Sequence, residues 1–220
     1  MSDAAKSPLA ASECAATSPQ IPVVLSERHA HLTREIMEQL FFDEHWTSGL
    51  PARPDSRGAP LQALSDRVTL VGPRGRLAQV RVVGPPRAEC QVELSQSDAR
   101  MLGIHAPLRE SGNLKDTPGV FVEGPRACVR LEHGVIRTLR HVHLDPAGAD
   151  RFGLRDGDHI DVEPAVGPPR TLFCDVLVRV SAAFEPQLHL DAEEGLAAGL
   201  HNGSLVMVKP VPSLPARPRL

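Results

Sequence analysis

One five-residue motif occurs twice in this chain, each time after an apolar segment, and it constrains both the fold and the chemistry. Its two copies hold four of the ten histidines, in the sequences Arg28-His29-Ala30-His31-Leu32 and Arg140-His141-Val142-His143-Leu144. Side chains alternate between the faces of a β-strand, so the two histidines of each copy project from one face. Two imidazoles placed in this way can chelate a divalent ion at about 2.0–2.1 Å per bond. A single such pair is more often a pair of exposed strand histidines, but its repetition in a common context favours metal binding.

Each copy is followed by the start signals of a short helix. Thr33 and Asp145 suit the N-cap position, and Pro146 suits the first helical position. The same order of strand, cap and helix recurs at Ser95, with Asp98 three residues on, and at Asp191. The sequence therefore predicts four short strands that each turn directly into a short helix.

A residue that can bind a metal stands two positions before the cap in all four units. These residues are His31, Glu93, His143 and His189. Taken alone, Glu93 would be read as a solvated carboxylate and His189 as a core histidine. With His29 and His141, the set supplies five imidazoles and one carboxylate, enough for two three-ligand sites with open coordination positions. Open positions are typical of catalytic rather than structural zinc.

Beyond these residues, an ordered series of motifs resembles the PduL-type phosphotransacylases, also called phosphate propanoyltransferases. The resemblance runs from Ile21 to about Val208. The matching segments are Val24–Leu32, Val68–Gly75, Val83–Arg87 with Gln91–Ser95, Gly103–Gly112, and Gly134–Ile136 with Arg140–His143.

The resemblance implies a mainly β, α+β fold with short helices: two small β-barrels with a metal site in the cleft between them. The first barrel is expected to be split, with residues 21–31 plus 140–209, and the second to comprise residues 32–139. Residues 1–20, rich in Ala and Ser, are expected to form a disordered leader or a targeting peptide, and residues 210–220 an extended tail.

Short β-branched segments bounded by Gly and Pro support a barrel fold independently of the resemblance. Residues 47–60 contain five Gly and Pro residues and are expected to form a surface loop. The strands expected from these segments are 68–71, 77–83, 119–122, 127–131, 159–162 and 176–180.

The activity that the resemblance implies is that of a phosphate acyltransferase. Such an enzyme interconverts a short-chain acyl-CoA and phosphate with an acyl phosphate and CoA, by direct phosphate attack on the thioester of propanoyl-CoA or acetyl-CoA. It uses two divalent ions per chain, for which zinc is the expected metal and cobalt or iron would also fit the ligands. One ion, held by His29 and His31, would bind the CoA sulfur. The other would bind phosphate, and its ligands would be Glu93, His141, His143 and His189.

Arginines and one serine complete the site that the resemblance implies. Arg87 is expected to be the catalytic phosphate clamp, because a planar guanidinium suits phosphate oxygens. Arg109 and Glu110 lie in a matching segment without a derivable role, and an internal ion pair is the favoured interpretation. The residues expected to bind CoA are Ser26, Arg28, Arg74 and Arg81.

Three alternatives stay open at this point. A metal-dependent acyl-CoA hydrolase would use the same histidines to activate water. A non-catalytic metal-binding scaffold protein would need no anion clamp. Within the transferase hypothesis, Cys90 is a rival nucleophile that could form an acyl-enzyme, although a free cysteine is more often a small buried hydrophobe.

Composition fits an intracellular enzyme and excludes some other classes. The formal net charge of -3 argues against a nucleic-acid partner, and no apolar segment approaches the ~20 residues that span a bilayer. The four cysteines show no CxxC spacing and are read as reduced thiols in the cytoplasm. Relatives that enter bacterial microcompartments carry an N-terminal extension, whose place the leader occupies without a clear amphipathic helix. Microcompartment partners and a homo-oligomer are left open.

Overall fold

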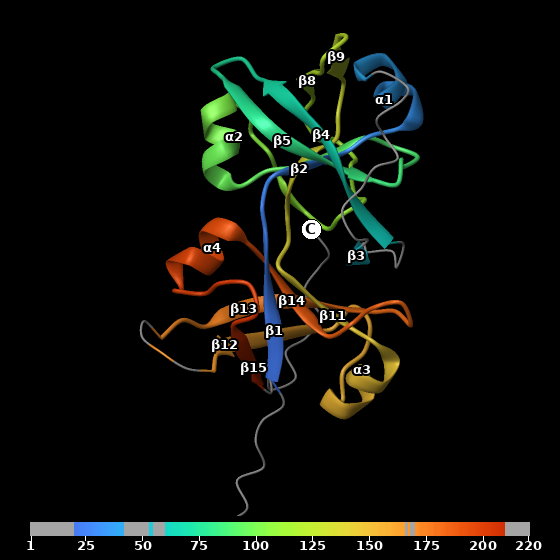
Figure 1. Ribbon diagram of the computed structural model, residues 1–220. Helices are drawn as coiled ribbons and strands as arrows, with labels where there is room; N and C mark the ends of the chain where they lie inside the picture. Colours follow the sequence, from blue (N-terminus) through green and yellow to red (C-terminus); the bar gives the residue numbers. More distant parts are fainter. Residues whose placement is uncertain (1–19, 42–52, 55–59, 166, 168–169, 210–220) are drawn as a thin grey trace, which may run out of the picture.

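The chain forms two β units that lie one above the other (Figure 1). The computed structural model describes residues 20–41, 53–54, 60–165, 167 and 170–209. The leader predicted for residues 1–20 therefore lies outside the described residues except for Gln20, which already belongs to a strand. The tail predicted for residues 210–220 also lies outside them.

The lower unit in Figure 1 is a closed six-stranded barrel with its own apolar core. Val142, Val178 and Leu188 are fully buried in that core. Neighbouring strands around the barrel are β1 (Gln20–Ser26), β14 (Gln187–Asp191), β11 (His141–Leu144), β13 (Phe173–Val180), β12 (His159–Pro164) and β15 (Leu205–Lys209).

The upper unit is a nine-stranded sheet around a second core, in which Leu70, Val82 and Val92 are buried. The predicted mainly β fold of two barrel-like units with short helices is confirmed. Within the described residues the end strands of this second unit do not pair with each other, so it is an open sheet that curls into a half-barrel. Its strands, in spatial order, are β7 (Leu108–Arg109), β10 (Val135–Thr138), β6 (Gln91–Glu93), β2 (His29–His31), β5 (Arg76–Gly84), β4 (Pro60–Val71), β8 (Val120–Glu123) and β9 (Cys128–Leu131), with β3 (Arg53–Pro54) paired to β4.

The predicted boundary between the two units needs a correction at β2. The expectation assigned residues 21–31 to the split barrel, but β2 pairs with β5 and β6 of the open sheet. The chain therefore passes from one unit to the other between Ser26 and His29. The predicted loop at 47–60 also needs a correction, because it contains β3 and because β4 already begins at Pro60.

Four short helices begin at the four predicted caps. They are α1 (Arg34–Leu40), α2 (Gln96–Leu102), α3 (Pro146–Phe152) and α4 (Ala192–Ala197). The side chains of Thr33, Ser95, Asp145 and Asp191 each accept a hydrogen bond from a backbone N–H of the first turn. Each ligand-bearing strand therefore ends within two residues of a fixed helix start, which orients the ligand side chain.

The two halves of the chain repeat one topology and exchange their first strands. Strand β1 runs parallel to β14 of the second half, and β10 runs parallel to β6 of the first half. The antiparallel pairs β2–β6 and β11–β14 share one register, with His29 opposite Glu93 and His141 opposite His189. The two halves therefore share one pattern of strand pairing, and the pairing of the exchanged strands brings residues of both halves into each unit.

Candidate metal and substrate site

Six predicted ligands form two groups of three in the structure. The His–Glu group contains His29, His31 and Glu93, and the three-histidine group contains His141, His143 and His189. Within each group, the candidate ligand atoms all lie within 4.8 Å of one another. This grouping corrects the expected partition, which assigned Glu93 to the second ion. The cause is the register of β2 and β6, which places Glu93 opposite His29.

Hydrogen bonds to backbone carbonyls fix the tautomers of three histidines. The Nδ1 atom of His29 lies 2.8 Å from the Glu27 carbonyl, and that of His141 lies 2.9 Å from the Leu139 carbonyl. In His31, Nδ1 lies 3.2 Å from the Val83 carbonyl. A carbonyl oxygen only accepts, so each Nδ1 carries a proton and donates it, which leaves a lone pair on Nε2 of the neutral ring. Metal-binding histidines are commonly held in this way.

Burial favours the neutral form of His31, His141 and His143. Burial is the largest cause that lowers the pKa of His31 and of His141. Burial, followed by the charges of His141 and Arg179, lowers the pKa of His143 to about 3. A neutral imidazole binds a metal ion without first releasing a proton, so these rings are prepared for that role near neutral pH.

The carboxylate of Glu93 is held ionised by its surroundings. Burial alone would raise its pKa, but His29, His31, the Thr138 hydroxyl and Arg87 lower it to about 2. Thr138 donates its hydroxyl to Oε2, and Gln91 donates its side-chain amide to Oε1. Neither residue was expected from the sequence. Thr138 lies on β10, so its role depends on the pairing of β10 with β6, whereas Gln91 lies on β6 itself, two residues before Glu93.

Two observations fit a divalent cation in these groups. In the His–Glu group, Nε2 of His29 faces Oε2 of Glu93 at 3.6 Å, close to the roughly 3.3 Å between two ligands of a tetrahedral zinc ion. In the three-histidine group, Nε2 of His143 is buried and has no hydrogen-bond partner among the described residues. A buried polar atom without a partner is costly, and a metal ion would satisfy it. The ring of His143 is stacked on Phe184 with centroids 3.9 Å apart.

A narrow cleft between the two β units contacts both groups. Ser26 and Arg28 line it together with Glu93, His141 and His189. Arg81 is adjacent to the His–Glu group because its position on β5 is paired with His29. Arg74 lies instead in a separate groove of about 620 Å³ that also contains Arg100 and Arg137.

Arg87 lies within electrostatic reach of the cleft. Its charge lowers the pKa of both His31 and Glu93, and its backbone N–H donates to the Leu32 carbonyl at 3.0 Å. Glu93 in turn raises the pKa of His141, so the two groups are also coupled to each other. A second cation, Arg179, lowers the pKa of His141 and His143. No motif in the sequence points to Arg179.

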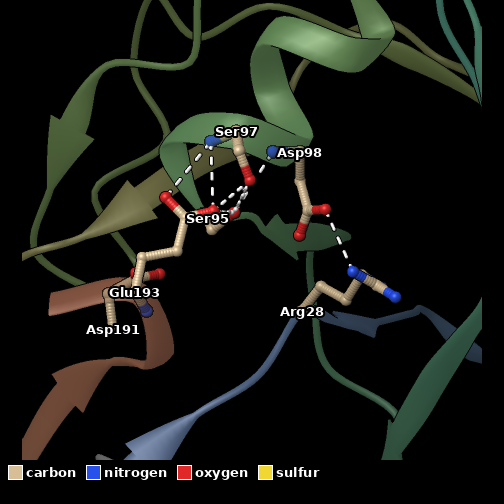
Figure 2. Close-up of polar contacts among 6 residues, drawn as sticks. All are labelled: Arg28, Ser95, Ser97, Asp98, Asp191 and Glu193. Atoms are coloured by element: carbon tan, nitrogen blue, oxygen red, sulfur yellow. Dashed lines mark hydrogen bonds and ion pairs between the residues drawn. The ribbon is translucent and has the colours of Figure 1, made fainter. Parts of the chain in front are cut away.

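Polar contacts across the boundary connect the two units beside the cleft. Glu110 pairs with Arg179 at 2.8 Å, whereas the guanidinium of Arg109 donates to the Leu108 carbonyl at 3.1 Å. Glu193 of α4 accepts a hydrogen bond across the boundary from Ser95 at 2.6 Å, whereas Arg28, in the segment that joins β1 to β2, pairs with Asp98 at 3.0 Å (Figure 2). Arg28 therefore has a structural partner as well as a place on the cleft wall.

The fold and the site define a class of protein: an enzyme with a cleft between two β units and two three-ligand groups on its wall. A sequence profile for the family described as phosphate propanoyltransferase matches residues 22–201. The chain belongs to the phosphate propanoyltransferase family, as the resemblance predicted, and the prediction of an acyltransferase enzyme is confirmed with it.

Three relatives illustrate how evenly the similarity covers the chain. A phosphate propanoyltransferase of Thermotoga maritima is 41% identical over 190 residues, which are 86% of this chain and 89% of the relative. One of Rhodopseudomonas palustris is 43% identical over 193 residues, 86% of this chain and 82% of the relative. One of Salmonella typhimurium is 42% identical over 187 residues, 83% of this chain and 85% of the relative. Among the described residues, no helix is long and apolar enough to cross a membrane.

Proposed function

We propose that the chain interconverts a short-chain acyl-CoA and phosphate with an acyl phosphate and CoA, by direct attack of phosphate on the thioester. The observation that carries the proposal is the presence of two preorganised ligand groups at one cleft, with the cation Arg87 close enough to lower the pKa of Glu93. The relatives' name, phosphate propanoyltransferase, supports propanoyl-CoA as a substrate, and acetyl-CoA differs from it by one methylene.

The reaction brings a dianion to a carbonyl and expels a thiolate whose conjugate thiol has an ordinary pKa of ~8.5. Divalent ions held by the two groups, two per chain with zinc the expected metal, would supply positive charge for the phosphate and for the leaving sulfur. Because the Glu93 carboxylate offsets charge in its own group, the three-histidine group is the more positive of the two when loaded. We assign the phosphate to the three-histidine group and the CoA sulfur to the His–Glu group.

The positions of the arginines indicate different roles for them in the reaction. Arg87, beside the His–Glu group, would hold phosphate oxygens and favour the transition state over the ground state. Ser26 and Arg28 line the cleft and Arg81 is paired with His29, so these three residues would contact CoA. Arg74 lies in the separate groove, so a contact from it would be to the distal end of CoA.

A thiol-release assay with propanoyl-CoA and acetyl-CoA, run with and without phosphate, tests the reaction and the substrate together. The proposal expects CoA release that depends on phosphate, with an equal amount of acyl phosphate trapped by hydroxylamine. Release that continues without phosphate would indicate a hydrolase, and no release with either substrate would favour a metal-binding scaffold protein.

A further inference from the structure

We propose that Glu193 is a positioning residue: it attaches the first turn of α2 to α4 across the boundary between the two units and thereby fixes the separation of the two ligand groups. The kinetic part of this inference rests on the proposed function. Its structural part does not, because it concerns only how the two β units are held together.

The side-chain hydrogen bonds of Glu193 lead to one short segment of the opposite unit. Its Oε1 accepts from the Ser95 hydroxyl at 2.6 Å, and both oxygens lie 3.3 Å from the Ser97 backbone nitrogen. The Ser97 hydroxyl also donates to it. Ser95 meanwhile accepts from the Asp98 N–H as the cap of α2. Figure 2 shows the carboxylate against this first turn, so one side chain from α4 satisfies donors that the α2 helix cannot satisfy itself.

The repeat explains why this contact is central. Ser97 and Glu193 each stand two residues after the cap of their helix, Ser95 and Asp191. They are therefore equivalent positions of the two halves, so this contact joins the two halves at the same point of their repeated pattern. The ion pairs Arg28–Asp98 and Arg140–Glu194 repeat in the same way, each joining the arginine of the five-residue motif to the third residue after the cap.

The position of the contact gives it control over the ligand groups. Ser95 follows Glu93 by two residues, and Glu193 follows His189 by four. A second contact between the units is the ion pair of Glu110 with Arg179, which lies on β13 opposite His143. Strand β11 lies between β14 and β13, so the Glu193 contact and the Glu110–Arg179 ion pair lie on either side of the three-histidine group. Loss of the Glu193 contact should leave each ligand group intact and allow one unit to shift against the other.

Kinetics of Glu193→Ala test the positioning role. Displacement of reacting groups by about 1 Å can cost up to 10²-fold in rate, so we expect kcat to fall tenfold or more. KM for phosphate and for acyl-CoA should change less than threefold, and the metal content should equal that of the wild type. Ser97→Ala, which keeps the Ser95 cap, should lower kcat in the same direction, and the double variant should be no worse than Glu193→Ala. Glu185→Ala, which removes an equal charge at an exposed site, is the matched control.

Two exposed cysteines allow a readout that needs neither metal nor activity. Cys128 lies in the open sheet and Cys174 in the barrel, so nitroxide labels on them report the distance between the units in a full-length Cys14→Ser, Cys90→Ala background. Pulsed electron–electron double resonance should give a broader distribution of label distances for Glu193→Ala than for the labelled protein with Glu193 intact or for Glu185→Ala.

An unchanged distribution, or a kcat loss that follows loss of metal, would overturn the inference. If the wild type released no thiol in the presence of phosphate, the proposed function would fail while the label distances still decided the role of Glu193.

Discussion

The imidazole rings of His141 and His189 are stacked, with centroids 4.9 Å apart and planes within 2° of parallel. The pairing follows from the antiparallel register of β11 and β14, which sets the two residues opposite each other. The same register sets His29 opposite Glu93 in the other half. The same strand register therefore builds both ligand groups. Single substitutions can test the role of each residue in them.

The first prediction is that the purified protein holds close to two divalent ions per chain. His141→Ala and His189→Ala each remove one of three ligands from the same group, so each variant should retain about one ion and lose turnover. Elemental analysis together with the thiol-release assay measures both effects. His105→Ala, an exposed histidine outside both groups, should keep both ions. Two ions in both of the first variants would show that these residues are not ligands.

A second prediction concerns the support of Glu93. Thr138→Val keeps the side-chain shape but removes a hydroxyl that donates to the carboxylate. Residues that orient a ligand in this way contribute about 10–100-fold to metal affinity, so the His–Glu group should bind its ion at least tenfold more weakly, as measured by chelator competition. Thr117→Val, at a buried threonine that contacts Leu114 and Gly134 instead, should leave both affinities unchanged. Equal affinities for Thr138→Val and the wild type would contradict the role given to Thr138.

Several of these features could be predicted from the sequence because they are local. The four caps and the ligand two residues before each of them depend on strand and helix spacing within a few residues. The assignment of Glu93 to its group depends on which strand lies beside β6, and that is set by packing between distant segments. The same holds for Thr138, Arg179 and Glu193, whose partners lie 45 to 98 residues away in sequence or in the other unit. Closure of the barrel likewise depends on the pairing of β1 with β15, at opposite ends of the described chain.

A third prediction separates direct phosphate attack from an acyl-cysteine intermediate. Burial raises the pKa of the Cys90 thiol, and its Sγ accepts a hydrogen bond from the Thr33 N–H. A protonated thiol with a structural partner is a poor nucleophile. Cys90→Ala should therefore keep kcat within about threefold of the wild type, with at most about 1 kcal/mol lost in unfolding free energy. Loss of turnover in a folded, metal-loaded Cys90→Ala protein would restore the acyl-enzyme mechanism.

A fourth prediction links Glu193 to pH. Burial would raise its pKa, but the hydroxyls of Ser95 and Ser97 and the Ser97 N–H outweigh burial and lower it. A carboxyl whose pKa is lower in the folded than in the unfolded chain stabilises the fold above its unfolded pKa, and that contribution is lost as the pH falls through the folded pKa. The difference in urea midpoint between the metal-free wild type and Glu193→Gln should thus be present at pH 7 and shrink below about pH 4.5. A difference that stays constant from pH 7 to pH 3 would contradict this linkage.

The most direct test of the account is the apparent KM for phosphate of Arg87→Ala, measured at saturating propanoyl-CoA and compared with its KM for propanoyl-CoA at saturating phosphate. If Arg87 holds the attacking phosphate, the phosphate KM should rise at least tenfold, and kcat/KM should lose about 3 kcal/mol, as expected for a charged contact in a water-poor site. Arg87→Lys should recover part of the loss, and the metal content should not change. A variant that keeps its phosphate KM and loses only affinity for propanoyl-CoA would contradict the account and move Arg87 to the CoA channel.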